Sequence, residues 1–259
     1  MRRGHSLSSR VATCREHTRR LGRKPDVILF LAASLDGASQ LALEREYAAI
    51  ESELRMAPNR ADFELCSRWA VGVDEMARHL MELQPTVIHF SGHGLRGTPR
   101  HGRSASRTRD VGVAAAYHGG ICLRNEHGGV HVLTAHGLAR VINSSTSSAR
   151  VVVLNACYSN AHARRLCGVV DCVVGMSGPI PDHDARCFAA GFYRALGNRR
   201  SVGQALDHAV AMLDANRLAS RSRPRLRTRT GIDPDQLVLT PAPESGHCCA
   251  GAGRLERQP

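Results

Sequence analysis

Two short segments of the sequence carry a histidine and a cysteine that could together perform nucleophilic catalysis. His93 lies in Ser-Gly-His-Gly (91–94) and Cys157 lies in Asn-Ala-Cys-Tyr-Ser (155–159), and each segment ends an apolar run. A free cysteine is only a few per cent thiolate at neutral pH, and a nearby imidazole raises that fraction and later protonates the leaving amine. The pair would therefore suit a reaction in which a thiolate attacks a peptide carbonyl.

The residues around this pair offer further groups that such a reaction needs. Gly94 has no side chain to block access, and its backbone N–H, with that of Cys157, could form an oxyanion hole for a tetrahedral intermediate. A helical stretch follows Cys157, and a helix N-terminus nearby favours the thiolate. The spacing alone leaves another interpretation open, in which His93 is a turn residue and Cys157 is a small buried residue at a strand end.

Alternating strand-like and helix-like segments between about 26 and 216 would position these groups. Strands are predicted at 27–33, 63–70, 86–91, 150–156 and 171–176, with a hairpin formed by 120–124 and 130–133. Helices are predicted at 41–56, 74–83, 134–142, 182–196 and 201–218, with Thr134 as an N-cap. Because the strands are apolar throughout, we expect a mostly parallel sheet covered on both faces. In such sheets the active groups lie at the carboxyl ends of the strands, which is where His93 and Cys157 fall.

The two motifs and their order resemble the CHAT family of caspase-like cysteine peptidases. The resemblance is carried by His-Phe-Ser-Gly-His-Gly (89–94), followed by Val-Val-Val-Leu-Asn-Ala-Cys-Tyr-Ser (151–159). Further segments agree at 28–34, Glu46, 175–176, 182, 188–196 and 201–205, so that the resemblance covers roughly 26–216. It implies a caspase-like three-layer α/β/α sandwich, an α/β fold with a mostly parallel central sheet. It also implies that His93 is the base and Cys157 the nucleophile.

The same resemblance suggests a role for Asp182. Members of the family carry an acidic residue after the strand that lies beyond the nucleophile, and Asp182 falls at that place. In separase-like relatives an acid near there helps to bind a basic P1 side chain, which would make Asp182 a substrate-binding residue. The alternative is that Asp182 is the N-cap of the helix running to Leu196.

The sequence departs from the caspase pattern in two places. The signature Gln-Ala-Cys-(Arg/Gln/Gly)-Gly is replaced by Asn-Ala-Cys-Tyr-Ser at 155–159. The histidine and cysteine are 64 positions apart, against about 50 in caspases, and the Arg-rich stretch 95–118 could account for the difference. Neither departure removes the dyad, and no autoprocessing site can be named.

The positive charge of the chain lies mostly outside the predicted catalytic body. The formal net charge is +12, and the excess of arginine falls in 1–24, 96–110 and 217–230. We expect a basic N-terminal segment (1–24), a CHAT peptidase domain (25–218) with an Arg-rich loop (95–118), and an Arg- and Pro-rich, mostly irregular tail (219–259). The preference for arginine over lysine fits GC-rich coding and phosphate binding equally well.

The sequence argues against a membrane or secreted protein. The longest apolar run, 27–33, is too short to span a bilayer, and no signal peptide precedes it. Nine cysteines at irregular spacing fit mostly free thiols in a reducing compartment, so we expect a cytoplasmic protein. The cysteines expected to fill the core are Cys66, Cys122, Cys167, Cys172 and Cys187.

Cofactor sites are not indicated either. Gly-His-Gly-Leu-Arg-Gly (92–97) matches a dinucleotide-binding pattern, but no helix can open directly after it, and there is no phosphate-binding P-loop. The histidine pairs His89–His93 and His127–His131 have no cysteine cluster at zinc-finger spacing. We therefore expect no cofactor and no metal.

Two functions of different classes remain. The first is a cysteine endopeptidase acting on a protein or peptide substrate. Since an unrestrained cytoplasmic protease harms its host, it would be a regulated effector, switched on by a partner protein or small-molecule signal in a bacterial signalling or antiviral defence system. The second is a non-proteolytic binding module of the same fold, contacting nucleic acid or an acidic partner through its Arg-rich segments. The intact His93 and Cys157 favour the first.

Overall fold

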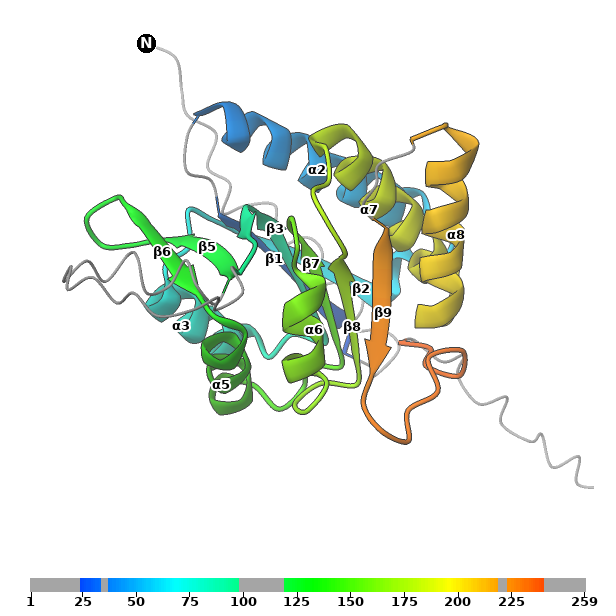
Figure 1. The fold of residues 1–259 in the computed structure, drawn as a ribbon. Coiled ribbons are helices and arrows are strands. Elements are labelled where there is room, and N and C mark those ends of the chain that lie inside the picture. Colours follow the sequence, from blue (N-terminus) through cyan, green and yellow to red (C-terminus); the bar gives the residue numbers. More distant parts are fainter. Residues whose placement is uncertain (1–23, 34–36, 98–118, 219–222, 240–259) are drawn as a thin grey trace, which may run out of the picture.

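Two layers of helices enclose a six-stranded sheet (Figure 1). The structure is a computed structural model and describes residues 24–33, 37–97, 119–218 and 223–239. The strands are β1 (Asp26–Ala33), β2 (Phe63–Trp69), β3 (Val87–Gly92), β7 (Val151–Asn155), β8 (Cys172–Met176) and β9 (Pro224–Thr228). Their order is β2-β1-β3-β7-β8-β9, with β9 antiparallel to β8 and every other neighbouring pair of this sheet parallel. The predicted α/β sandwich with a mostly parallel sheet is confirmed.

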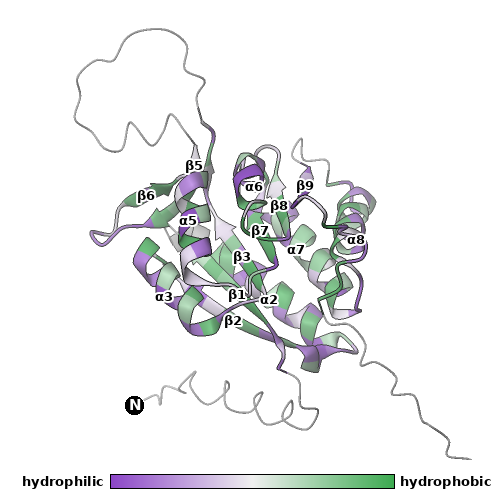
Figure 2. Ribbon diagram, turned by 90° about the horizontal axis from the view of Figure 1, so that it is seen from below, coloured by the Kyte–Doolittle hydropathy of each residue, from purple (hydrophilic) through white to green (hydrophobic). Residues whose placement is uncertain are grey.

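The helices bury both faces of this sheet. One face is covered by α2 (Gly37–Met56), α7 (Asp182–Gly197) and α8 (Val202–Ala215), and the other by α3 (Val73–Leu83), α5 (Ala135–Ser145) and α6 (Asn160–Leu166). A short 3₁₀ helix, Arg60–Asp62, leads into β2. Along β1, Phe30 packs on the first face and Leu31 on the second, which is why the strand is apolar at successive positions. Figure 2 shows the apolar strands between helices whose outer sides are hydrophilic.

A second, smaller sheet extends from the carboxyl end of β3. It consists of β4 (Gly94–Leu95), β5 (Gly120–Arg124) and β6 (Val130–Leu133), and the predicted hairpin of the last two strands is confirmed. The expected N-cap of α5 is also confirmed, since the Thr134 hydroxyl accepts a hydrogen bond from the Gly137 N–H at 3.2 Å. Most of the predicted Arg-rich loop, 98–118, lies outside the described residues. No helix in the described part of the chain is long and apolar enough to cross a membrane.

Strand β9 lies in the stretch for which the sequence predicts a mostly irregular tail. It forms the edge of the main sheet, and beyond it Leu237 and Leu239 are buried in the core beside α8. Arginines alternate with other residues along Pro-Arg-Leu-Arg-Thr, which hides the apolar signal of an edge strand. The part of the tail over 223–239 is therefore integral to the fold, and 240–259 lies outside the described residues.

A buried carboxylate ties this edge strand to the centre of the sheet. Asp171, directly before β8, accepts a hydrogen bond from Arg150 Nε at 3.0 Å and another from the guanidinium of Arg229, which follows β9. Burial alone would raise the pKa of the Asp171 carboxyl, but the two guanidinium groups outweigh burial and hold that pKa below its usual value of 3.8. The ionised form of Asp171 is therefore favoured by folding.

We expect Asp171→Asn to lower the free energy of unfolding at pH 7 by about 2 kcal/mol, because charged hydrogen bonds are lost at a buried site. A pKa lowered by folding contributes stability above the unfolded value, and that contribution disappears as the pH falls through the folded value. Urea denaturation at pH 7 and pH 3 should therefore show a gap between wild type and variant that shrinks in acid. Asp207→Asn, at an exposed position of α8, is the control. A gap of equal size at both pH values would contradict this role.

Candidate active site

The register of β3 and β7 brings His93 and Cys157 to the same level of the sheet. The two strands are parallel neighbours, and their last pair joins Ser91 to Asn155. His93 and Cys157 each follow that pair by two positions. This register is strongly specified because both faces of the strands are buried, so a slip of one residue would exchange the two cores. The predicted approach of the two motifs at neighbouring strand ends is confirmed.

Both residues line a pocket of about 340 Å³ at this edge of the sheet. Its walls come from the ends of β1, β3 and β7, from α2 and α7, and from Ile180 before α7. His93 is exposed and Cys157 is partly buried, so a chain entering from solvent can reach both. Asp182 lines the same pocket.

Gly94 packs directly against the backbone of Cys157. A Cβ at position 94 would overlap the Cys157 carbonyl oxygen and lie 3.3 Å from the Cys157 backbone nitrogen. Only glycine can therefore occupy this position without moving the loop that carries Cys157. The two backbones predicted to form an oxyanion hole are thus in close contact.

The turn that carries Cys157 is held in place by Ser159. The Ser159 hydroxyl is buried; it donates to the Leu154 carbonyl at 2.8 Å and accepts from the Met176 N–H at 2.9 Å, which joins the ends of β7 and β8. The Ile180 N–H lies 3.5 Å from the Cys157 sulfur and donates to it. The thiol in turn lies 4.0 Å from the Ile180 carbonyl oxygen, so both backbone groups of Ile180 contact the sulfur.

Tyr158, the residue after Cys157, adopts a left-handed backbone conformation. Its φ is +57°, which is costly for a residue with a bulky side chain, and its N–H donates to the Gly178 carbonyl at 3.1 Å. Cys157 and Tyr158 line different cavities as a result. The Cys157–Tyr158 peptide thus lies between two cavities at one sheet edge.

A buried carboxylate, Glu46 of α2, forms the floor of the pocket that His93 and Cys157 line. It is 4% exposed and accepts hydrogen bonds from His89 Nε2 at 2.8 Å, from the Ser91 hydroxyl at 2.7 Å and from Asn155 Nδ2 at 2.8 Å. Tyr193 completes the network, since its hydroxyl lies 3.1 Å from His89 Nδ1.

The protonation of this network follows from burial. Burial, with the nearby charge of Glu46, raises the pKa of the Tyr193 hydroxyl well above its usual value. Tyr193 therefore stays protonated, and its hydroxyl can donate to His89 Nδ1 while His89 Nε2 donates to Glu46. The sequence gives Glu46 only as part of the family resemblance. Its place on the apolar face of its helix, three residues after Leu43 and four before Ile50, is the signal that marks it as buried.

Asp182 is the first residue of α7 and is exposed at the pocket. The N-cap position is held by Pro181, and no side-chain cap hydrogen bond forms there. The expectation that Asp182 could be the N-cap is therefore wrong by one position. Its carboxylate still lies in the first turn, where negative charge is favourable.

Most of this chain matches a known protein family. The family model of the CHAT domain matches residues 3–226. The chain belongs to the CHAT family. It is 24% identical over 200 residues to a Roc-COR-CHAT protease from an unknown prokaryotic organism, an alignment that covers 74% of this chain and 17% of that protein. The CHAT domain described here thus spans a small part of that relative's length.

Among the described cysteines of the CHAT domain, Cys157 is the one that lines the pocket at the ends of β3 and β7. Cys122 and Cys172 are buried, as expected for core residues, and Cys66, Cys167 and Cys187 are partly buried. Burial raises the pKa of Cys172 to about 12 and also raises those of Cys122, Cys167 and Cys187, so these thiols stay protonated at neutral pH. Among the residues that the structure describes, no three His, Cys, Asp or Glu side chains gather as a metal site.

Proposed function

We propose that this CHAT domain is a cysteine endopeptidase with His93 as general base and Cys157 as nucleophile. The observation that carries the proposal is the β3–β7 register, which brings both residues to the rim of one pocket. His93 would take the thiol proton, and the Cys157 sulfur would then attack the scissile carbonyl carbon. The backbone N–H groups of Gly94 and Cys157 would stabilise the oxyanion.

The remaining steps follow from the same residues. The protonated His93 would give its proton to the leaving amine as the C–N bond breaks, which leaves a thioester on Cys157. A water molecule, deprotonated by His93, would then attack that thioester. The carboxylate product leaves, and the Cys157 thiol is restored.

The charge of the pocket supports a basic side chain at P1. Glu46 lies at its floor and Asp182 at its mouth. The Oδ1 atom of Asn155 is buried there and has no hydrogen-bond partner among the described residues. A guanidinium or ammonium group entering the pocket would meet three acceptors, one of them unsatisfied.

We expect Asp182→Ala to reduce the preference for Arg over Leu at P1 by about fivefold, a modest effect because the carboxylate is exposed and screened by water. The preference is measured as the ratio of kcat/KM for two peptides that differ only at P1. The matched control is Asp74→Ala, since Asp74 is also an exposed acid in the first turn of a helix but lies in α3. An unchanged ratio in Asp182→Ala would remove Asp182 from the substrate site.

The proposal as a whole is tested by incubating the full chain with a mixed peptide library and sequencing the new termini by mass spectrometry. Cleavage that clusters after Arg or Lys is the expected result. A lack of cleavage under every activating condition, candidate partner proteins included, would contradict it.

We further propose that the activity is regulated, as an effector in a bacterial signalling or defence system. Support comes from the exposure of His93 at the pocket, since an active site open to solvent would accept many polypeptides unless its activity were controlled. A partner protein or small ligand that switches the protein on would restrict cleavage to the moment it is needed.

A further inference from the structure

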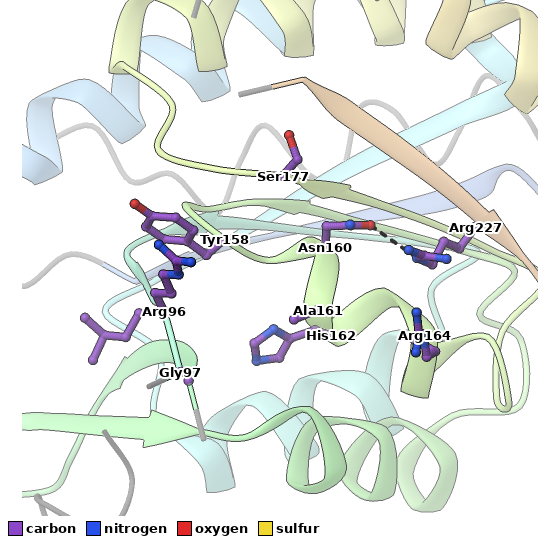
Figure 3. Close-up of a pocket in the computed structure, with 11 residues that line it drawn as sticks. Arg96, Gly97, Tyr158, Asn160, Ala161, His162, Arg164, Ser177 and Arg227 are labelled. Atoms are coloured by element: carbon purple, nitrogen blue, oxygen red, sulfur yellow. Dashed lines mark hydrogen bonds between the residues drawn. The ribbon is translucent and has the colours of Figure 1, made fainter. Parts of the chain in front are cut away.

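A second cavity, of about 490 Å³, lies at the same sheet edge on the side of α6. Figure 3 shows its lining: His162 and Arg164 project from α6, Arg227 comes from β9, and Arg96 lies alongside the Tyr158 ring. The catalytic pocket instead lies on the side of α2 and α7. The two cavities share no lining residue and meet at the Cys157–Tyr158 peptide.

The three arginines of this second cavity are not neutralised by the described part of the chain. Arg150, Arg194, Arg199, Arg223 and Arg229 each pair with a carboxylate. Arg96, Arg164 and Arg227, by contrast, have no carboxylate within 4.0 Å among the described residues. Arg227 donates to the Asn160 side-chain oxygen at 3.3 Å, and the Arg96 guanidinium lies 5.8 Å from the centre of the Tyr158 ring. Guanidinium groups gathered without acids form a site for carboxylate or phosphate oxygens.

His162 adds an independent sign of a missing ligand. It lines the cavity, is 3% exposed, and neither ring nitrogen has a hydrogen-bond partner among the described residues. Burial lowers the pKa of His162 and outweighs the opposing effect of the nearby Ser159 backbone, which lies too far away or too poorly aligned to form a regular hydrogen bond with the ring. The ring is therefore neutral at pH 7 and keeps one N–H to donate. A buried donor without a partner is costly, and an oxyanion in the cavity would satisfy it.

The place of this cavity relates it to the leaving group. His93 protonates the leaving amine in the proposed reaction, and the residues that follow it, Leu95 to Gly97, form one wall of the cavity. With P1 in the pocket of Glu46 and Asp182, a chain that continues past Cys157 towards α6 would reach Tyr158 and this cavity. The acidic pocket and the basic cavity therefore flank the nucleophile on opposite sides.

We propose that this cavity, lined by Arg96, Arg164, Arg227 and His162, binds acidic side chains of the substrate on the C-terminal side of the scissile bond. The inference rests on the proposed peptidase function and names the substrate class: a basic residue before the bond and Asp or Glu shortly after it.

The test compares two peptides with Arg at P1 and the same unprimed residues, one with Asp-Glu after the bond and one with Asn-Gln. We expect kcat/KM to be about tenfold higher for the acidic peptide. Arg164→Glu should remove that preference and favour a third peptide with Lys-Lys at those positions. Arg165→Glu, the neighbouring exposed position of α6 outside the cavity, should leave the preference unchanged.

A binding arm separates the failure of this inference from the failure of the peptidase proposal. The same peptides, carrying a fluorophore, are titrated with full-length Cys157→Ala, and the anisotropy gives Kd. Tighter binding of the acidic peptide that is lost in Arg164→Glu supports the inference. If the wild type nevertheless cleaves neither peptide, the peptidase proposal alone is contradicted. Equal binding of acidic and amide peptides overturns the inference whatever the cleavage result.

Inorganic pyrophosphate is the probe for the other source of anionic oxygens. If it binds the wild type more weakly than the acidic peptide and merely competes with it, a peptide ligand is supported. If it binds tightly through Arg164 while both peptides bind alike, the cavity serves a small phosphorylated ligand, and the inference is wrong.

Discussion

Cys157→Ala abolishes peptide cleavage, and His93→Ala lowers kcat/KM by about 10³-fold or more, if the dyad works as proposed. Without the sulfur no thioester forms. Without the imidazole the thiol keeps its proton, and the leaving amine receives none. Because the pair acts as a unit, the double variant should be no worse than Cys157→Ala alone. Initial rates with an Arg-P1 peptide measure each effect.

The matched control for this prediction is Cys167→Ala, which removes another partly buried thiol. Cys167 lies at the C-terminal end of α6 and lines neither cavity. The Cys167→Ala variant should therefore cleave the peptide at the wild-type rate. Circular dichroism should show that all variants are folded. Equal cleavage by wild type, Cys157→Ala and His93→Ala would mean that the activity comes from elsewhere in the chain or from a contaminant.

The second large effect is expected at Glu46, where one carboxylate satisfies three buried donors. Glu46→Leu would leave His89, Ser91 and Asn155 with unpaired polar groups in the core. We expect it to lower the free energy of unfolding by about 3 kcal/mol or more, which corresponds to a fall in Tm of roughly 6–12 °C for a chain of this size. Thermal unfolding followed by circular dichroism measures the change.

Glu46→Gln separates charge from hydrogen bonding at this position. The amide retains one oxygen acceptor but presents an N–H₂ group to the neighbouring donors. The free energy of unfolding of Glu46→Gln should therefore fall between those of the wild type and Glu46→Leu. It also removes the charge at the floor of the pocket, so the preference for Arg over Leu at P1 should drop along with stability. A Glu46→Leu variant that unfolds within 1 °C of wild type would contradict the structural role of the network.

The central strands and the motifs were predictable because their signals are local. Val151–Leu154 is apolar at every position, and the two motifs sit where such runs end. A strand buried on both faces leaves little freedom of register, so the meeting of His93 and Cys157 followed from chain order and a parallel sheet. The family resemblance then assigned their roles.

The Glu46 network and the basic cavity could not be predicted, because both are formed by contacts between distant segments of the chain. Glu46 and Asn155 are 109 positions apart, and nothing near either residue names the other as its partner. The basic cavity is likewise assembled from β4, the nucleophile loop, α6 and β9. β9 itself was missed because an edge strand needs few apolar residues, and its arginines match the Arg-rich, irregular composition that the sequence analysis assigned to the tail.

The shared register of β3 and β7 has a consequence for how the chain can change in length. His93 and Cys157 each lie two positions beyond the pair Ser91–Asn155. Deleting one residue inside β7 would pull Cys157 back by about 3.3 Å and send Val153 and Leu154 to the opposite layers. Deletions in the connection between α5 and β7 would leave that count untouched. The connections can therefore change in length at a cost in stability alone, such as loss of the Arg150–Asp171 ion pair, whereas the number of residues from each strand to His93 or Cys157 must be kept for the proposed dyad to form.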